Sequence, residues 1–457
     1  MNAEDGVVKD TKSKKSAKSS LKCLDEYLAR EEKDAKNSCK KIHIYPDPNV
    51  LDVVKNVMWA AGKFVDNLPK IRNKCVNIYT QWVGDPDAIA SAQALRELFL
   101  INGANDGRIL CGKIGHPQNL EMLEICNIVK FNPNDGRFVD NEINCIVDAS
   151  PPLGTKNTVM IQNPPTEFYF VCDHHNTSES VRELCEEFDV KSITIPIVGK
   201  RVGATSTMIA FMVSHLRQLD KITPETKAAL LLGIYSDTSG LMSGVTTLDS
   251  AMFNLLNVNR TSEIFASLNH YQYPEDWLKL KHRAYVNQVS TGRVRLTTTG
   301  LTPDNCRDVI AECANDIIRQ QGTAISFCLA VTMDGLDLSV RANSYLLRME
   351  PQRIVKVVDD LFNTLFPGKS GFKFSNSFPH NVEGGACIKL ETIDQVLLGI
   401  KEKNPDYKNE ELNKKNLSRC REYIEAIVKV LKDMAAEDPE LMAGLGLESK
   451  KEVVDVG

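Results

Sequence analysis

The sequence predicts an α/β fold in which an N-terminal domain with a parallel sheet precedes a smaller α+β domain. Short apolar runs alternate with helical patterns across residues 76–235, and this alternation is typical of βαβ units. From residue 289 onward, strand-like runs flank two helical runs. The chain has 457 residues, more than one hydrophobic core usually organises, so two domains are expected.

An N-terminal tail is expected at residues 1–42. It mixes Lys, Asp, Glu and Ser with almost no aromatic residues. Such a segment buries too little apolar surface to offset its loss of conformational entropy, so we expect a disordered or loosely helical tail.

The first domain is expected over residues 43–270. Its strands are predicted from apolar runs at 76–83, 107–112, 144–149, 167–172 and 192–198. Its helices are predicted at 49–67, 88–102, 205–219 and 229–235. Within 88–102 the apolar residues recur at steps of three and four, which indicates a helix with one face packed on the sheet.

A linker helix is expected at residues 271–288, and the smaller domain at residues 289–400. The smaller domain's strands are predicted at 294–300, 324–332, 336–342 and 387–391, and its helices at 306–320 and 353–366. Residues 401–457 should form a C-terminal helix and tail. The helical period at 409–436 leaves two alternatives open: the helix packs on its own domain, or it joins two copies in a homodimer.

Composition restricts the class of protein. No apolar run approaches the roughly 20 residues of a membrane-spanning helix, and the N-terminus is too polar for a signal peptide, so we expect a cytoplasmic protein with no membrane partner. The 13 cysteines form no C-x-x-C pair, which favours reduced thiols over a disulfide framework. A net charge of -5 gives no overall attraction for nucleic acid.

Four motifs with carboxylates each follow an apolar run. They are Asp85-Pro86-Asp87, Asp148, Asp173-His174-His175 and Asp237-Thr238. A single Asp in a loop is more often structural, because its side chain bonds to nearby backbone. The carboxyl ends of parallel strands, however, meet at one edge of a sheet. Histidine nitrogen with several carboxylate oxygens suits Mn²⁺ or Mg²⁺, and no cysteine pattern indicates structural zinc.

The order of these motifs resembles the DHH phosphoesterase superfamily over roughly residues 76–392. The matching patterns are D-x-D-A-x-x-S at 85–91, the lone Asp148, D-H-H at 173–175 and G-I-x-x-D-T at 233–238. GHPQN at 115–119 and GATST at 203–207 resemble the exopolyphosphatase-related and nanoRNase-like branch. The second domain resembles the DHH-associated domain through 339–342 and through 378–386, which keeps His380 and Gly385.

The resemblance implies two divalent cations, Mn²⁺ with Mg²⁺ as the alternative, in an active-site cleft between the domains. Asp148 would bridge the two ions. The first ion would bind Asp85 and Asp148, with Gln81 as a further candidate ligand, and the second would bind Asp87, Asp148, His174 and Asp237. His175 would face the substrate phosphate, and Asp173 would orient the histidine pair.

Two departures from the family pattern bear on function. Gln81 stands where this branch usually has a histidine, and an amide oxygen is a poorer ligand for a transition metal; His116 is a candidate replacement. Phe378-Pro379 replaces two glycines that let the backbone approach the substrate. These departures leave open the alternative that the protein is a catalytically degenerate binding or regulatory module.

Other residues are candidates for binding substrate phosphate. They are Arg341, His380, Gly385, Lys200, Arg201 and His116. Arg341 has a salt bridge as its structural alternative. The helix start in GATST could offer its N–H groups to a phosphate, or could simply be capped by Thr205 or Ser206.

The function expected from these observations is two-metal hydrolysis of short oligonucleotides or small nucleotide phosphates. Inorganic polyphosphate or pyrophosphate is the alternative substrate class, because the same machinery suits both. Base recognition would need stacking or edge contacts, whereas a phosphate chain needs only positive charge.

Overall fold

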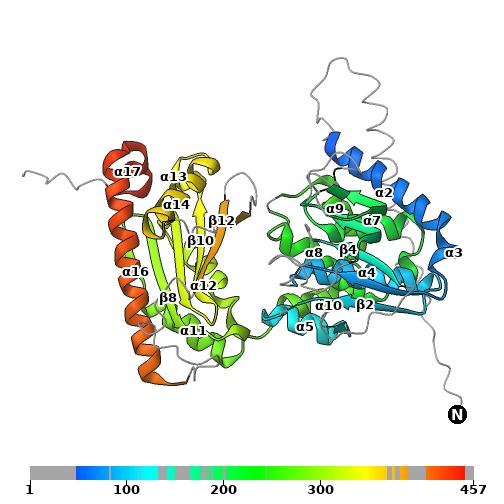
Figure 1. The fold of residues 1–457 in the computed structure, drawn as a ribbon, viewed down its shortest axis with the longest axis horizontal. Helices are drawn as coiled ribbons and strands as arrows, with labels where there is room; N and C mark the ends of the chain where they lie inside the picture. The colour runs from blue at the N-terminus through cyan, green and yellow to red at the C-terminus, as the bar shows by residue number, and fades with distance from the viewer. Residues whose placement is uncertain are drawn as a thin grey trace, which may run out of the picture. The chain divides into compact units, whose positions relative to one another are not determined.

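The computed structural model describes most of the chain in two compact units, unit 1 (Met1–Gln272) and unit 2 (Tyr273–Gly457) (Figure 1). The described residues are 48–81, 84–112, 114–131, 142–149, 165–175, 183, 185–186, 189–198, 202–242, 244–367, 373–375, 381–389 and 408–447. The tail expected at 1–42 and the Phe378-Pro379 segment lie outside them.

Unit 1 is built on a six-stranded parallel sheet. Its strands are β1 (Cys75–Tyr79), β2 (Asp106–Leu110), β3 (Lys130–Phe131), β4 (Ile143–Val147), β5 (Glu167–Asp173) and β6 (Ser192–Val198). They lie in the order β3-β2-β1-β4-β5-β6, and every pair is parallel. The predicted parallel sheet is therefore confirmed, with the two-residue β3 as an unpredicted addition. From β1 the chain adds β2 and β3 on one side, and it then adds β4, β5 and β6 on the other side. The order of the strands therefore reverses between β1 and β4, and ligands of open parallel sheets bind at such a point.

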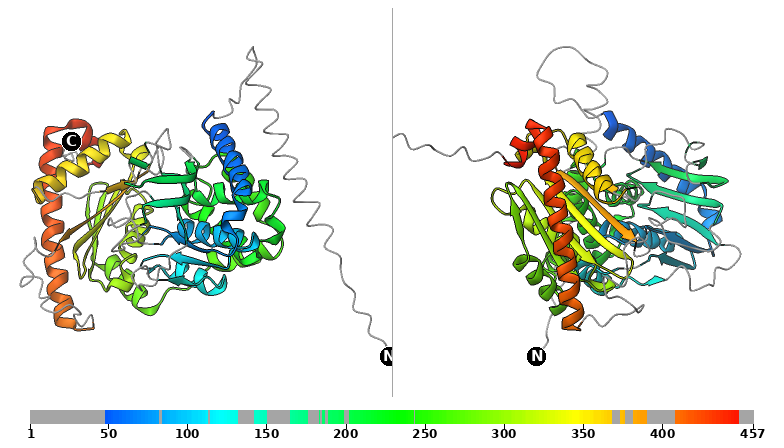
Figure 2. Two further views of the ribbon diagram at one scale, coloured as in Figure 1. Left: turned by 45° about the vertical axis from the view of Figure 1, so that its right-hand side comes forward. Right: turned by 60° about the vertical axis from the view of Figure 1, so that its left-hand side comes forward.

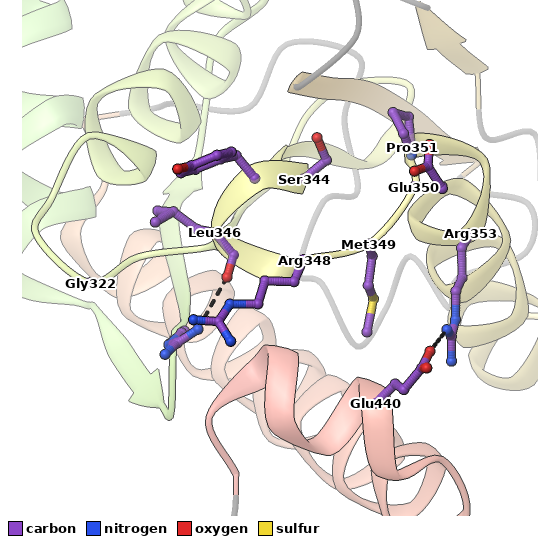
Figure 3. A pocket seen from close by; sticks show the side chains of 11 residues that line it. Gly322, Ser344, Leu346, Arg348, Met349, Glu350, Pro351, Arg353 and Glu440 are labelled. Carbon is purple, nitrogen blue, oxygen red and sulfur yellow. Dashed lines mark hydrogen bonds and ion pairs between the residues drawn. The ribbon is translucent and has the colours of Figure 1, made fainter.

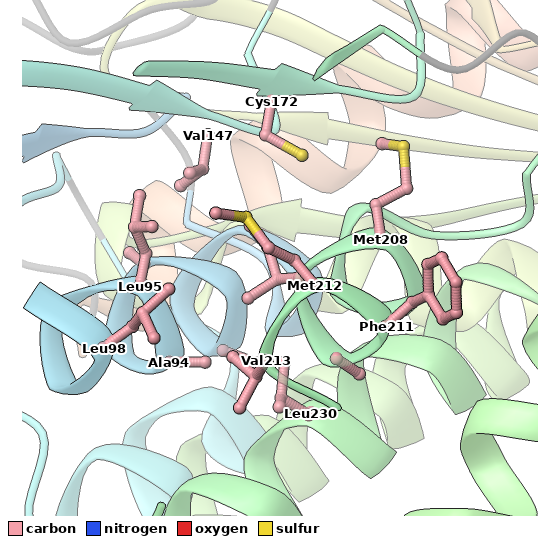
Figure 4. Packing of buried hydrophobic residues seen from close by; sticks show 14 of the residues in the cluster. Ala94, Leu95, Leu98, Val147, Cys172, Met208, Phe211, Met212, Val213 and Leu230 are labelled. Atoms are coloured by element: carbon pink, nitrogen blue, oxygen red, sulfur yellow. The ribbon is translucent and has the colours of Figure 1, made fainter. Parts of the chain in front are cut away.

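Helices of unit 1 bury one face of this sheet's central strands. The helices of unit 1 are α2 (Pro48–Asp66), α3 (Leu68–Ile71), α4 (Pro86–Ile101), α5 (Pro117–Ile125), α7 (Thr205–His215), α8 (Pro224–Asp237), α9 (Thr247–Leu256) and α10 (Arg260–Asn269), with a 3₁₀ turn η1 (Leu219–Lys221). Figure 4 shows Leu95 of α4 and Met212 of α7 pointing toward Val147 and Cys172 on the sheet. This packing holds the starts of α4 and α7 beside the ends of β4 and β5.

Unit 2 contains a mixed sheet with helices on both faces. Its strands are β7 (Val289–Thr291), β8 (Val294–Leu301), β9 (Ile325–Val331), β10 (Gly335–Asn343), β11 (Lys373–Ser375) and β12 (Asn381–Lys389), in the order β11-β12-β10-β9-β8-β7. Only the β8–β9 pair is parallel among these described strands. Its helices are α11 (Glu275–Val286), α12 (Val309–Ile318), α13 (Ser344–Leu347), α14 (Pro351–Leu365), α16 (Glu410–Glu437) and α17 (Pro439–Leu445), with a 3₁₀ turn η2 (Asp304–Cys306). The smaller α+β domain is thus confirmed as a fold class.

Two helices of unit 2 pack onto other elements of the same unit. The helix expected as a linker, α11, packs through Trp277 and Leu280 onto Val309 of α12. The long α16 buries Ile424, Leu431 and neighbouring apolar residues in the core formed with α14 and the sheet. Figure 2 shows α16 running along this sheet. The apolar stripe of 409–436 is therefore covered by its own unit.

Eleven cysteines lie among the described residues, and all of these are free thiols. Most are buried, as expected for small apolar side chains in a reduced protein. In the described part of the chain, no helix combines the length and the apolar character needed to cross a membrane.

Asn409 caps the start of α16, and its removal is expected to weaken unit 2. Its side chain accepts hydrogen bonds from the backbone N–H groups of Glu411 at 3.0 Å and Leu412 at 3.1 Å. Asn409→Ala should lower the free energy of unfolding by about 1 kcal/mol, while Asn409→Asp keeps the cap. Urea denaturation would measure both, and equal stability of the alanine variant and wild type would contradict the assignment.

Candidate metal centre

Asp85 and Asp87 are placed by the start of α4. Asp85 is the N-cap, and its side chain accepts a hydrogen bond from Ala88 N at 2.8 Å, with Pro86 as the first helical residue. Asp87 follows in the first turn and is fully buried. Its two oxygens each accept a 2.7 Å hydrogen bond from the first turn of α7, one from Thr205 N and one from Ser206 N. Asp87 is therefore fixed by a second helix as well as its own.

Asp148 follows β4 and is 1% exposed. Its φ of 51° lies in the left-handed region, which is uncommon for a residue other than glycine, although Asp and Asn enter it more readily than most. Thr205 Oγ1 donates to its Oδ1 at 2.9 Å. A buried carboxylate held in a strained backbone conformation is typical of functional sites.

His174 follows the last residue of β5. Its Nδ1 lies 3.1 Å from the Val202 carbonyl oxygen. Its Nε2 lies 3.3 Å from an Asp237 oxygen and 3.5 Å from an Asp148 oxygen. Among the described residues, this buried Nε2 has no hydrogen-bond partner of normal geometry. It is therefore oriented toward two carboxylates without being satisfied by either.

These side chains converge into one group. Ligand atoms of Asp87, Asp148, His174 and Asp237 all lie within 4.8 Å of one another. Three carboxylate oxygens and an unsatisfied imidazole nitrogen form a donor set that fits a divalent cation such as Mn²⁺ or Mg²⁺. The residues come from the starts or ends of β4, β5, α4 and α8, at the carboxyl edge of the sheet.

His175 is oriented by Asp173. The Asp173 carboxylate is buried, and its Oδ1 lies 2.9 Å from His175 Nδ1 and accepts the His175 backbone N–H at 3.1 Å. The His175 side chain is 51% exposed, in contrast to His174, at 12%. The two adjacent histidines thus have different environments: one is within the carboxylate group, and the other faces solvent.

Burial and like charges shift the pKa values of the cluster. Burial raises the pKa of Asp85 to about 8, and the charges of Asp148 and Asp87 act in the same direction. Burial, followed by the charge of Asp87, raises the pKa of Asp148 to about 8 and that of Asp237 to about 7. Burial opposes the charging of His175, but the Asp173 hydrogen bond outweighs it and raises the pKa to about 9.

The metal-free protein is expected to lose stability as the pH rises from about 4 to about 9. In this range the folded state holds protons on Asp85, Asp148, Asp237 and His175 that the unfolded chain has released. Stability must therefore fall with pH, by linkage. A bound cation would displace the protons of its ligands Asp148 and Asp237, so Mn²⁺ should weaken the dependence. Thermal unfolding across this range, in EDTA and in Mn²⁺, tests this; a metal-free Tm that rises with pH would contradict it.

Gln81 interacts with the two carboxylates expected at the first ion. Its Nε2 donates a hydrogen bond to Asp85 Oδ2 and another to Asp148 Oδ2 at 3.2 Å. Asp85 belongs to neither of the potential metal-binding groups found among the described residues. The proposed replacement, His116, caps α5 instead: its Nδ1 accepts the Gln118 backbone N–H at 3.2 Å.

The structure describes some of the residues that were expected to bind substrate phosphate. Lys200, Arg201 and His380 lie outside the described residues. Arg341 on β10 donates to Asn315 at 2.6 Å and to Ser339 at 3.0 Å, and lies 3.6 Å from Glu383, so its expected alternative, an ion pair, is present. Gly385 on β12 pairs with Ser339 in the register of β10.

The start of α7 differs from both expectations for it. Its N-cap is Ala204, which has no side-chain cap, so Thr205 and Ser206 are not the capping residues. The N–H groups of Thr205 and Ser206 bind Asp87, a carboxylate of the chain itself, where a substrate phosphate was the alternative. An internal anion thus satisfies this helix terminus.

Sequence reasoning did not identify Asp249, a buried carboxylate that supports this region. It accepts hydrogen bonds from Gly203 N at 3.0 Å and from Thr207 Oγ1 at 2.5 Å, on the two sides of the residues that hold Asp87. With Thr246 it also forms a capping box at the start of α9. The T-x-x-D spacing could have indicated the cap, but not the contact with α7.

Unit 2 has a surface pocket of about 900 Å³ around α13 (Figure 3). Arg348 lines one part of it, and the ion pair between Arg353 and Glu440 lines another. None of the residues predicted from the sequence to bind metal or substrate lines this pocket.

Comparisons with known proteins bear on the fold. No protein-family profile matches the sequence. An uncharacterised protein of Methanocaldococcus jannaschii is 24% identical over 332 residues, which cover 71% of this chain and 65% of that protein. The chain therefore spans about two thirds of the length of that relative.

One solved structure is similar to the chain in fold, and another matches it only weakly. An exopolyphosphatase-related protein from Bacteroides fragilis has a TM-score of 0.50 and 14% identity, covering 81% of this chain and 96% of that one. A pGpG-specific phosphodiesterase from Vibrio cholerae has a TM-score of only 0.28 and 11% identity, covering 71% of this chain and 96% of that one, and does not establish a shared fold. The chain thus has the fold of the exopolyphosphatase-related protein.

Proposed function

We propose that the chain is a divalent-metal-dependent phosphoesterase of the DHH type. The observation that carries this proposal is the convergence of Asp87, Asp148, His174 and Asp237 within 4.8 Å at the carboxyl edge of the sheet. Such a buried group of like charges is costly to maintain without a cation, because each carboxylate loses water and repels the others. A group that a fold maintains at this cost is a candidate for function.

The four residues of the group would hold the ion. A divalent cation bound there would polarise a phosphoryl oxygen and lower the pKa of a bound water. His175 is directed by its hydrogen bond to Asp173, which fixes Nδ1 and leaves Nε2 free to contact an oxygen of the phosphate. Asp173 thus orients His175 and stabilises its charged form, and Thr205 Oγ1 holds the Asp148 carboxylate in place.

Short oligonucleotides and small nucleotide phosphates are the proposed substrates, with inorganic polyphosphate or pyrophosphate as the alternative class. Arg341, Gly385, His380, Lys200, Arg201 and His116 are the proposed phosphate contacts. Arg341 supports this only in part. Its guanidinium N–H groups already donate to Asn315 and Ser339, so they would have to be shared between these residues and a ligand. Five donors in a planar fork allow such sharing.

Phosphate release from a small panel of substrates, with Mn²⁺ or Mg²⁺, tests the proposal. The panel consists of pApA, phosphoadenosine phosphate, a short RNA, pyrophosphate and polyphosphate. We expect turnover of at least one substrate, its loss in His174→Ala, and its retention in His215→Ala, a matched change at an exposed histidine outside the group. No turnover and no retained metal would instead favour a catalytically degenerate binding or regulatory module.

A further inference from the structure

We infer that the candidate metal centre holds one divalent cation, and that the amide of Gln81 takes the place of a second by joining Asp85 to Asp148. This inference deepens the proposed function and rests on it for the nature of the site. It departs from the two-ion arrangement that the family resemblance implies.

The described ligand groups provide for one ion rather than two. Asp87, Asp148, His174 and Asp237 supply four donors in one group. The other group among the described residues, Asp148 with both histidines, shares Asp148 and His174 with the first. In addition, His175 Nδ1 is already bonded to Asp173 at 2.9 Å. The two groups are therefore overlapping descriptions of one site.

Asp85, the carboxylate expected to complete a first ion site, has both oxygens engaged by the protein. Its Oδ1 accepts the Ala88 N–H at 2.8 Å and so caps α4. Its Oδ2 accepts a hydrogen bond from Gln81 Nε2. Asp148 Oδ2 accepts from the same nitrogen at 3.2 Å, so one amide group spans the two carboxylates.

The chemistry of the amide explains why it can replace a cation here. A glutamine Nε2 carries two N–H donors, one for each carboxylate, whereas its Oε1 can only accept. The reverse orientation would bring three oxygens together with no donor between them, which is unfavourable unless a cation is present. A histidine at position 81 would instead offer a neutral nitrogen ligand, the arrangement suited to a second ion.

Metal stoichiometry tests the inference directly and does not depend on turnover. Full-length protein would be saturated with Mn²⁺, freed of excess metal and assayed by elemental analysis and electron paramagnetic resonance. We expect one Mn²⁺ per chain, with the resolved hyperfine pattern of an isolated ion. Two ions per chain with an exchange-broadened spectrum would overturn the inference and leave the proposed function intact. No bound Mn²⁺ would overturn both.

Variants at position 81 separate the role of the amide from that of a ligand. Gln81→His should raise the stoichiometry to two ions, and if it stays at one, Gln81 is not what excludes the second. Gln81→Ala should keep one ion but lower the Tm of the metal-free protein by several degrees, because two buried carboxylates lose a donor. Loss of the ion in Gln81→Ala would show that Gln81 is a ligand and overturn the inference. Gln118→Ala, which removes a side-chain amide that donates to the Leu268 carbonyl at 3.1 Å, is the matched control and should leave the stoichiometry unchanged.

Discussion

Asp148→Asn is expected to abolish metal-dependent turnover and, at the same time, to stabilise the metal-free protein. Asp148 lies in both potential metal-binding groups of the described residues, so every arrangement of a cation there uses its charge. Changes to groups that only orient metal ligands cost about 10- to 100-fold in affinity or activity, so loss of this ligand charge should cost more than about 100-fold.

The opposite effect on stability follows from the same burial. Burial and the charge of Asp87 raise the pKa of Asp148 from 3.8 to about 8. The wild-type folded state must therefore either bind a proton or bear a desolvated charge, and a neutral amide avoids both. The advantage of Asn should grow as the pH rises from about 4 to about 8 and then level off, because the folded and unfolded states bind equal numbers of protons outside that interval.

Two measurements on one pair of variants check this prediction. Turnover with Mn²⁺ and thermal unfolding in EDTA would be recorded for Asp148→Asn and for Asp189→Asn. Asp189 is an exposed aspartate with a φ of 50°, close to the 51° of Asp148, so the control reproduces the backbone conformation but not the burial. Full activity of Asp148→Asn would refute the assignment of the site, and a lower metal-free Tm would refute the electrostatic argument.

Gly233→Ala is expected to disrupt the centre from a position that bears no functional group. A Cβ at Gly233 would lie 2.4 Å from Ser206 Oγ, 3.0 Å from Asp87 Cα and 3.1 Å from Asp87 Oδ1. Because the nearest backbone atom belongs to α4, α8 would have to move away from it. Overpacking of this kind lowers the free energy of unfolding by about 1–3 kcal/mol. It should also move the Asp87 carboxylate away from the N–H groups of the first turn of α7 that it accepts from.

Gly62→Ala provides the matched comparison for this prediction. Gly62 lies in α2, and a Cβ there would meet no atom within 4 Å. The change should stabilise the helix by about 0.5–1 kcal/mol, because alanine loses less backbone entropy than glycine. Urea denaturation and Mn²⁺ titration would be measured for both. If Gly233→Ala matched wild type in stability and Mn²⁺ affinity, the close packing of α8 on α4 would not be what positions Asp87.

Much of the fold and several members of the centre could be predicted from local patterns. Apolar runs separated by helical periods indicated the parallel sheet, and acidic residues directly after those runs indicated its carboxyl edge. The three short strands β3, β7 and β11 gave no such pattern, since two or three residues show no periodicity. The longer helices and strands could be predicted because their periods reflect which faces are buried.

The sequence by itself placed Asp148 and His174 at one edge of the sheet, because they directly follow two parallel strands and the parallel order brings the strand ends together. Only the tertiary structure decided how those residues are paired. Thr205 and Asp87 are 118 positions apart, and Gln81 and Asp148 are 67 apart. Whether a buried carboxylate is satisfied by a helix N-terminus, by an amide or by a cation depends on distances of a few tenths of an ångström between such segments, and no local pattern encodes them.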